Sequence, residues 1–481
     1  MSAPPFHFGI LVLLALAALA SGCATQLLPI QQAFRQGDFQ GAAEGSRAYA
    51  RRHAGGSPQT VIAHIEHGSM ARMIGNFRES DAAFARAEAR MAELDRKPGI
   101  STSERLSAMA RTPDRIAYEG FAYDRQFVAA YRALNALAMG DTETPRQHFV
   151  RADRWQSLAI AQNRERAERL RRDQAAARGQ ARGFDQTLSD PRLDAQTKEK
   201  YGDLERFEPY ADYANPYIDT LRAVYLMGVA ESPSDYDLAR NLLRRAAGMS
   251  PDNPFVREDL DLADALSRGA VEPPDLVHVF FETGLAPFRG QTRLSIPVFL
   301  VSDRVQVVPI AAPYLVFDER SVTALRIDTP DTVYTTAPLA SLDRIVAAEF
   351  QAQLPGLITR MIAAAVFKVG VQYGVTEFAE RVDPILHIAA IIGGLIWASA
   401  TNEADLRTWA TLPKEVQYAR LPAPSGGEIT LLIGAQSYVV PVEPEGVSLV
   451  VVRSVSSGTP PLIVSSPLDP TTPIRMAPEQ Q

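Results

Sequence analysis

Residues 67–91 read HGSMARMIGNFRESDAAFARAEARM, and in this stretch small and bulky residues recur at the spacing of an α-helix. The pattern is carried by Gly68, Gly75, Phe77, Phe84 and Ala87. Small residues allow two helices to approach closely, bulky residues fill the space between them, and a glycine relaxes the connecting turn. The stretch therefore predicts a pair of antiparallel helices.

The same arrangement returns in residues 33–43, 134–152 and 236–251. The last of these repeats the second-helix half of the pattern, at Tyr236, Ala239, Leu243, Ala246 and Pro251. Four matches before residue 270 resemble tetratricopeptide repeats. We predict a tetratricopeptide-like helical domain over residues 23–270, whose stacked hairpins would offer a concave binding surface.

The chain changes character near residue 270. After the sequence SRGAVEPPD at 267–275, short alternating runs of Val, Ile, Thr and Pro indicate strands. We predict a linker at the Pro-Pro pair, then a β-sandwich-like domain formed by residues 275–340 and 413–456. Residues 457–481 are expected to form a Pro-rich flexible tail. The predicted fold class is thus multidomain α+β.

Residues 341–402 interrupt the strand pattern with two apolar runs. The second run, 385–400, would be about 24 Å long as a helix, which is shorter than the roughly 30 Å hydrocarbon core of a bilayer. Arg360 and Lys368 place charges in the first run. We predict an inserted, buried helical hairpin. The alternative is a segment that inserts into a membrane or docks on a partner.

The N-terminus carries an unbroken apolar run from Ile10 to Ala20, followed by Ser21, Gly22 and Cys23, the only cysteine. A helix of this run would span about 16 Å, too little for a membrane span but typical of a secretory signal peptide over residues 1–22. The ending ASGC resembles a bacterial lipobox. This resemblance implies lipid attachment at Cys23 and, because Ala24 follows, an outer-membrane protein facing the periplasm. The alternative is a buried structural cysteine.

Several phrases, above all FFETGLAPFRGQTRLSIPVFL at 280–300 and ADLRTWATLPKEVQYARLPAP at 404–424, resemble a family of uncharacterised bacterial lipoproteins with tetratricopeptide-like repeats. Genes of that family are often found near a lipoprotein activator of penicillin-binding proteins. The resemblance therefore implies a role in envelope or cell-wall assembly, but it assigns no reaction. The matching positions are Glu282, Gly284, Leu285, Ala286, Pro287, Asp405, Arg407, Trp409, Leu412 and Pro413.

The charged members of this set have a structural interpretation. Glu282, Asp405 and Arg407 could form an ion pair that locks the inserted hairpin to the β-domain, and Trp409 could be a core aromatic. The alternative is that these residues form a ligand site.

Composition and motifs narrow the possible chemistry. The net charge of −7 argues against a nucleic-acid binder. The sequence contains no phosphate-binding Gly-rich loop, no Gly-x-Ser-x-Gly elbow and no His-Glu-x-x-His motif. His64 and His67 have a spacing that could hold a metal beside Glu66, but a third ligand is not evident. We expect no metal, no cofactor and no small-molecule substrate.

The Arg-rich stretch 164–182 is expected to be a solvated helix leading to a loop, or alternatively a contact for lipid headgroups or peptidoglycan. For the whole chain we expect a non-enzymatic, lipid-anchored scaffold or adaptor that binds envelope proteins or peptides. The alternatives are an envelope hydrolase with an unfamiliar site and a membrane-inserting component of an export assembly.

Overall fold

The computed structural model describes residues 23–96, 116–180, 184–210, 214–299, 305–319, 322–372, 403–468 and 475–476. Helices fill the N-terminal part and sheets follow, so the mixed α+β class is confirmed. The predicted signal peptide, the apolar run 385–400 and the side chains of Cys23 and Lys368 lie outside this description.

The N-terminal part consists of consecutive helices that pack on their neighbours. Short polar side chains cap several of them: the Asp38 carboxylate accepts a hydrogen bond from the Gly41 N–H, and the Asn76 side chain accepts one from Glu79. The helices are α2 (Cys23–Arg35), α3 (Phe39–Arg52), α4 (Thr60–Met73), α5 (Phe77–Asp95), α7 (Ala122–Ala138), α8 (Thr144–Gln180), α11 (Pro216–Gly228), α12 (Pro233–Met249) and α13 (Pro254–Ser267).

Inner and outer helices differ in burial. Every residue of α4 is buried, and so are residues 216–227 of α11, whereas α5 and α12 bury only one face. The inner helices are enclosed because their second side packs against the chain's own sheet and the segment that precedes β7. The helical surface that we expected to be open for a partner is therefore covered by other parts of the same chain.

The largest sheet is centred on β1 (Leu276–Thr283), which pairs in parallel with β10 and antiparallel with β7. All eight residues of β1 are buried because both faces of the sheet are covered. The strand order is β12 (Arg475–Met476), β11 (Leu462–Pro467), β10 (Val447–Ser454), β1, β7 (Glu415–Pro422) and β6 (Ala337–Ser341).

Alternation along β1 separates the two faces of this sheet. Val277, Val279 and Phe281 pack against a second, four-stranded sheet, whereas Phe280 belongs to the core shared with the helices. The second sheet has the order β5 (Val333–Thr335), β4 (Arg326–Asp328), β8 (Glu428–Ile433) and β9 (Gln436–Pro441). The chain thus forms three layers, helix on sheet on sheet, and one core runs through the helical and β parts.

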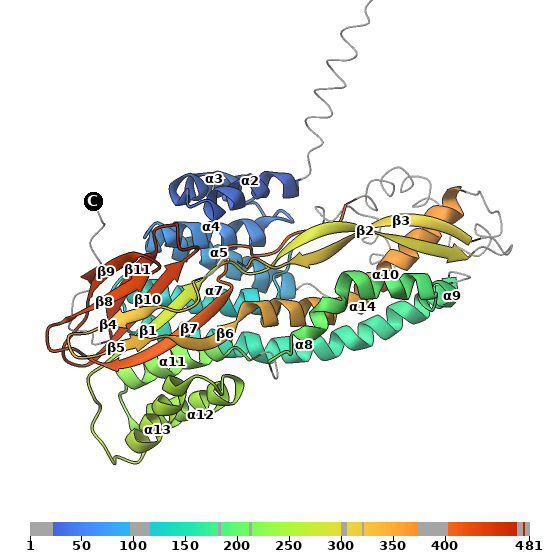
Figure 1. Ribbon diagram of the computed structural model, residues 1–481. Helices are drawn as coiled ribbons and strands as arrows, with labels where there is room; N and C mark the ends of the chain where they lie inside the picture. Colours follow the sequence, from blue (N-terminus) through green and yellow to red (C-terminus); the bar gives the residue numbers. More distant parts are fainter. Residues whose placement is uncertain are drawn as a thin grey trace, which may run out of the picture.

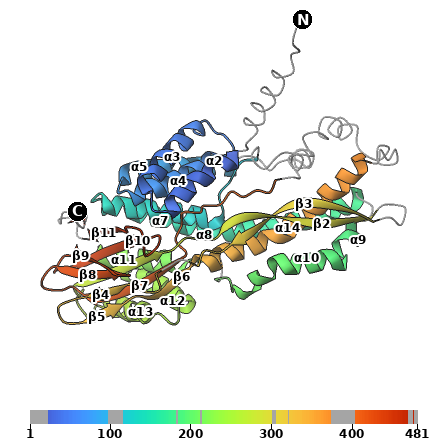
Figure 2. The ribbon, with the colours of Figure 1, turned by 45° about the horizontal axis from the view of Figure 1, so that its top comes forward.

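Strands β2 (Phe288–Phe299) and β3 (Val305–Val316) form a separate two-stranded sheet, so their assignment to the sandwich was wrong. Leu294, Ile296 and Val308 on one face join the helical core instead. Figures 1 and 2 show this hairpin extending away from the sandwich beside helices, a projection we call the arm. Its helices are α8, α9 (Phe184–Leu188), α10 (Pro191–Tyr201), η2 (Gly202–Arg206) and α14 (Leu342–Gln372).

The exposed edge of β2 is capped by a side chain. The Gln196 amide of α10 donates to the Ser295 carbonyl at 3.1 Å and accepts from the Ser295 N–H at 2.9 Å. These are the two bonds that a neighbouring strand would make, so Gln196 blunts an edge that could pair with another chain.

Helix α14 is the first half of the predicted inserted hairpin. It contacts β2, β3, α8 and α9, so it packs on the arm. Arg360 is exposed on it. The second half of the predicted hairpin lies in residues 373–402, outside the described residues.

The prediction of a flexible tail from residue 457 was wrong for its first part. Every residue of β11 is buried, with Ile463 in the core between the sheets and Val464 packed on the helical side. Prolines flank this apolar run at 460, 461 and 467, which made it resemble a linker. The expected linker near 270 corresponds to the exposed residues 268–275 between α13 and β1.

Candidate functional site

Residues 403–414 cross from the arm to the sandwich between the inner helices and the six-stranded sheet, and we call them the strap. The Ala404 N–H donates to the Gln291 side chain at 2.8 Å. At the other end, the Lys414 N–H donates to the Thr283 carbonyl at 2.9 Å. The strap thus follows directly after the undescribed residues 373–402 and ends on β1.

Asp405 and Arg407 form a two-bond ion pair, with the Arg407 Nε and Nη2 atoms 2.8 and 2.7 Å from the two carboxylate oxygens. Burial acts to raise the pKa of Asp405, but the hydrogen bonds and charge of Arg407 outweigh it and hold this pKa below its ordinary value. Arg407 also donates to the Ile116 carbonyl at 2.7 Å. The expected pair therefore exists, but it fastens the strap to the helical part.

Trp409 is a core aromatic, as expected, with 1% of its surface exposed. Its ring lies 5.7 Å from the ring of Phe84 and 5.9 Å from that of Tyr131, measured between centroids. Its indole N–H donates to the Ser69 hydroxyl at 2.8 Å. The strap is therefore anchored in the helical core by its largest side chain.

Glu66 of α4 holds the same part of the strap through its carboxylate. It accepts hydrogen bonds from the Ala410 N–H at 2.8 Å, the Thr411 hydroxyl at 2.7 Å and the Gln31 amide at 2.7 Å. Burial raises the pKa of Glu66 above its ordinary value, and these hydrogen bonds oppose the shift. Three donors from two segments thus converge on one fully buried acid.

Glu282 lies apart from Asp405 and Arg407, so the prediction that these three residues form one ion-paired group was wrong. The Glu282 carboxylate accepts hydrogen bonds from the Tyr217 hydroxyl at 2.8 Å and the Tyr131 hydroxyl at 3.3 Å. It faces the helices because the alternation of β1 turns residues 278, 280 and 282 to that side.

Arg453 stands beside Glu282 on the neighbouring strand β10, where the two residues are register partners. Its guanidinium donates to the backbone carbonyls of Glu282 at 3.3 Å and Thr411 at 3.2 Å. Burial lowers the pKa of Arg453, while Tyr131, Glu282 and Tyr217 act to raise it. We call the residues of this region the junction cluster: Glu66, Ser69, Arg72, Tyr131, Tyr217, Glu282, Trp409, Thr411 and Arg453.

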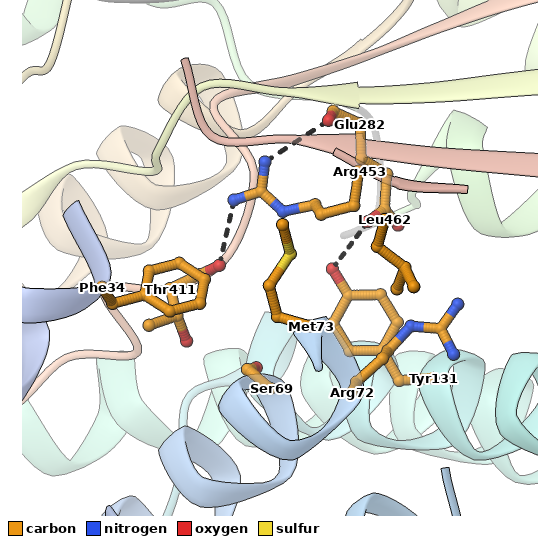
Figure 3. Close-up of a pocket in the computed structure, with 9 residues that line it drawn as sticks. All are labelled: Phe34, Ser69, Arg72, Met73, Tyr131, Glu282, Thr411, Arg453 and Leu462. Carbon is orange, nitrogen blue, oxygen red and sulfur yellow. Dashed lines mark hydrogen bonds between the residues drawn. The ribbon is translucent and has the colours of Figure 1, made fainter. Parts of the chain in front are cut away.

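A small cavity lies within the junction cluster (Figure 3). Its volume of about 20 Å³ has room for about one water molecule. Two guanidinium groups and one carboxylate meet there with apolar side chains. The lining residues are Phe34, Ser69, Arg72, Met73, Tyr131, Glu282, Thr411, Arg453 and Leu462. The junction cluster brings together residues of α4, α7, α11, β1, β10 and the strap, so its polar contacts connect the helical layer to the sheet.

The repeat positions lie inside helical pairs. A Cβ atom on Gly68 would lie 2.5 Å from the Phe84 ring, so α4 and α5 meet at a contact that only glycine permits. Phe77, Phe84, Ala87, Ala239, Leu243 and Ala246 are buried, Tyr236 is partly buried and Pro251 is exposed. Gly75 and Gly284 adopt positive φ angles of 74° and 69° in turns, while Leu285 and Pro287 are buried just beyond Gly284.

The two histidines of α4 are both buried. His67 lies 3.0 Å from the Ser46 hydroxyl and 3.1 Å from the Glu79 carboxylate. Burial lowers the pKa of His64 to about 4, so this ring is neutral near pH 7. Glu66 turns to the strap instead. Among the described residues, no three His, Cys, Asp or Glu side chains are grouped as metal ligands.

A second buried polar cluster joins α13 to the sheet. The Tyr418 hydroxyl lies 2.5 Å from the His278 Nδ1 atom and donates to the Asp259 carboxylate, which Arg420 also contacts at 3.2 Å. Burial raises the pKa of Asp259 to about 7 and lowers that of His278 to about 3. In a Ser-His-Asp triad the histidine lies between the serine and the acid, whereas here Tyr418 lies between His278 and Asp259, and all three side chains are buried.

No family model, curated protein or solved structure matches the chain. No helix in the described part of the chain combines the length and apolar character needed to cross a bilayer.

The sequence pointed to Glu282 and Trp409, but it did not reveal Arg72, Tyr131, Tyr217 or Arg453 as their neighbours. One signal was present for the charged members. Glu282 follows VHVFF, and Arg453 interrupts VSLVVVRSV, so each places a charge in a strand that is mostly apolar. A charge in such a strand is buried and therefore needs a partner.

Proposed function

We propose that the protein is a lipid-anchored scaffold or adaptor at the outer membrane that faces the periplasm and binds envelope proteins or peptides without catalysing a reaction. A lipid on Cys23 would confine the chain to the membrane surface and so raise its effective concentration towards partners there. The resemblance to lipoproteins encoded near an activator of penicillin-binding proteins directs the search for partners to cell-wall and outer-membrane assembly.

We also propose that the helical pairs α2–α3 and α4–α5 are tetratricopeptide-like units. The close contact between Gly68 and Phe84 supports this assignment. Since the inner helices are covered by the sheet and the strap, partner binding is assigned to the arm.

The observation that carries the scaffold proposal is the open face of the β2–β3 hairpin. Val305 and Val307 are 39% and 54% exposed, and Pro309 at the next alternate position is also exposed. Alternate residues of a strand share one face, so the three form an apolar strip, while Val308 on the opposite face is buried in the core. Such a strip on a projecting element is suited to contact with another protein.

A photo-crosslinking residue at position 307 tests this proposal in intact cells. We expect it to capture a distinct envelope protein. Val439 on β9 is the matched control, because it is the same residue type with 50% exposure on the sandwich. Capture of the same proteins from both positions, or of none from position 307, would contradict the assignment.

The membrane-inserting alternative makes a different prediction. A chain that starts at Ala24 should remain monodisperse without detergent if the apolar run 385–400 is covered within the protein. If that chain instead partitions into vesicles, and deletion of 373–402 with α14 retained abolishes the partition, the export-component alternative replaces the scaffold.

A further inference from the structure

Helix α13 is followed by the exposed segment 268–275, and it lies at the periphery of the molecule (Figure 1). Its neighbours include α12 and the strand β7. At its N-terminus, the Asn253 amide donates to the carbonyls of Ala337 and Pro338 on β6 at 3.0 and 3.1 Å. Since β6 is a terminal strand of the six-stranded sheet, the start of α13 covers an edge that could pair with another chain.

Only one face of α13 is buried, and an ionisable group lies near the middle of that face. The buried residues are Val256, Asp259, Ala263 and Leu266, and Asp259 has 0% exposure. Because the other three side chains are apolar, the attachment of this face to the rest of the molecule depends on the ionisation state of Asp259.

Two central strands of the sheet supply the polar neighbours of Asp259. On β7, the Tyr418 hydroxyl donates to its carboxylate and Arg420 contacts it at 3.2 Å. On β1, the His278 Nδ1 atom lies 3.9 Å from the same carboxylate. Burial keeps this histidine neutral near pH 7, because it lowers the pKa of His278 to about 3.

The cation beside Asp259 is shared with a second acid. The Arg420 guanidinium also lies 3.1 Å from the carboxylate of Glu258, the preceding residue of α13. On the side of α12, Arg240 contacts Asp264 at 3.4 Å, nearer the C-terminal end of α13. Among the described residues that contact Asp259, Arg420 is therefore the one cation, and its charge is divided between two carboxylates.

Ionisation of Asp259 favours movement of the helix rather than of the strands. A carboxylate without water is costly, and a shared cation compensates only part of the cost. Strands β1 and β7 lie inside a sheet and are held by neighbours on both sides. Helix α13 is instead bounded by the turn 250–253 and the exposed segment 268–275, so it can move away and admit water.

We propose that α13 is a pH-sensitive latch, which closes on the edge of the six-stranded sheet when Asp259 is protonated and opens when Asp259 is ionised. Opening separates Asn253 from β6 and frees the carbonyls of Ala337 and Pro338 to accept hydrogen bonds from an extended chain. The latch involves the sandwich rather than the β2–β3 hairpin, so it goes beyond the partner binding proposed above.

The direction of the pH effect follows from the burial of Asp259. Burial raises the pKa of this group to about 7 in the closed state, against about 4 when the helix is open and the group is hydrated. The closed state is therefore favoured most at acid pH, and it loses this advantage as pH rises to about 7. Between pH 5 and pH 8, the equilibrium constant for opening α13 should rise about 80-fold.

Hydrogen exchange of the full chain, followed by mass spectrometry at pH 5 and pH 8 and corrected for intrinsic exchange rates, measures this opening. We expect peptides from α13 to lose protection about 80-fold between the two pH values. At pH 8 they should exchange well before peptides from α4, every residue of which is buried. Asp259→Asn should abolish the pH effect in α13, whereas Asp261→Asn, at an exposed position of the same helix, should retain it.

Three results would overturn the latch. Equal protection of α13 at both pH values in the wild-type protein would do so without the need for a variant. Equal exchange of α13 and α4 at pH 8 would mean that α13 opens only when the whole molecule unfolds. A pH effect that persists in Asp259→Asn would assign the response to another group.

Discussion

The carboxylate of Glu66 accepts a hydrogen bond from the backbone N–H of Ala410, 2.8 Å away in space and 344 residues later in the chain. The same carboxylate also accepts hydrogen bonds from the Thr411 hydroxyl and the Gln31 amide. One buried acid on an inner helix therefore holds both the strap and the N-terminal helix.

Glu66→Ala should destabilise the protein by about 3 kcal/mol, because it leaves the buried donors of Ala410 and Thr411 and the partly buried Gln31 amide without their acceptor. Urea unfolding gives the free energy of unfolding. Glu44→Ala on α3 is the control, since Glu44 is exposed and its replacement should change stability by less than about 0.5 kcal/mol. Equal effects of the two substitutions would mean that the strap does not depend on Glu66.

Asp259→Asn should change the pH dependence of stability. Burial raises the pKa of Asp259 to about 7 in the folded protein, against about 4 when unfolded. A carboxyl group whose folded pKa is raised contributes stability below its unfolded pKa and loses it as pH rises through the folded value.

Asn cannot ionise, so Asp259→Asn should gain stability relative to the wild type between pH 5 and pH 8, by roughly 2–4 kcal/mol. Denaturant unfolding at both pH values measures the difference. Asp261→Asn, an exposed position on the same helix, should show no such trend. A wild-type-minus-variant difference that is flat with pH would contradict the raised pKa.

Phe84→Ala and Leu243→Ala should each cost about 2–5 kcal/mol, because both side chains are 0% exposed and their removal leaves a cavity. Leu238→Ala, at 38% exposure on the same helix as Leu243, should cost much less. Thermal or urea unfolding distinguishes the three variants. Small effects at the two buried positions would refute the helix register.

Substitutions at two glycines should have opposite effects on stability, because one glycine is tightly packed and the other is not. Gly68→Ala should destabilise by about 1–3 kcal/mol, because the new methyl group would meet the Phe84 ring. Gly248→Ala on α12 should stabilise by about 1 kcal/mol, because no atom lies within 4 Å of the added group and alanine favours the helix. The free energy of unfolding of both variants, measured side by side, tests this. A loss of stability in both would mean that α12 needs Gly248 as well.

Cys23→Ser should abolish lipid attachment and leave an unprocessed or released protein. Metabolic labelling with a palmitate analogue, followed by gel analysis of the chain, measures attachment. Label that persists in the variant would refute the assignment of Cys23.

Local patterns predicted the parts of the fold that depend on neighbouring residues. The contact of Gly68 with Phe84 follows from helical spacing, and the Asp405–Arg407 pair joins residues only two positions apart. Such patterns could not predict which distant segments would contact each other. Glu282 meets Tyr217 and Tyr131, which are 65 and 151 residues away, and no alternation rule specifies which helix will cover a strand.

The arm and the last strands show the same limit. The β2–β3 runs have ordinary strand patterns, but the partner of their apolar face is α14, which the sequence placed in a separate insertion. Strand β11 was not predicted because prolines flank it, although its Ile463 and Val464 are buried in two different hydrophobic clusters.

The parallel pairing of β1 with β10 sets an order of events during synthesis. Glu282 aligns with Arg453, which is made 171 residues later. Until the ribosome has delivered that strand, β1 lacks a neighbour on one side, and α4 has emerged long before the strap that Glu66 holds. The nascent chain can form helices early, but it cannot close its interior until nearly its whole length is present. A chain that stops before residue 454 would therefore expose charged groups and apolar surface together, which is the state that proteases remove.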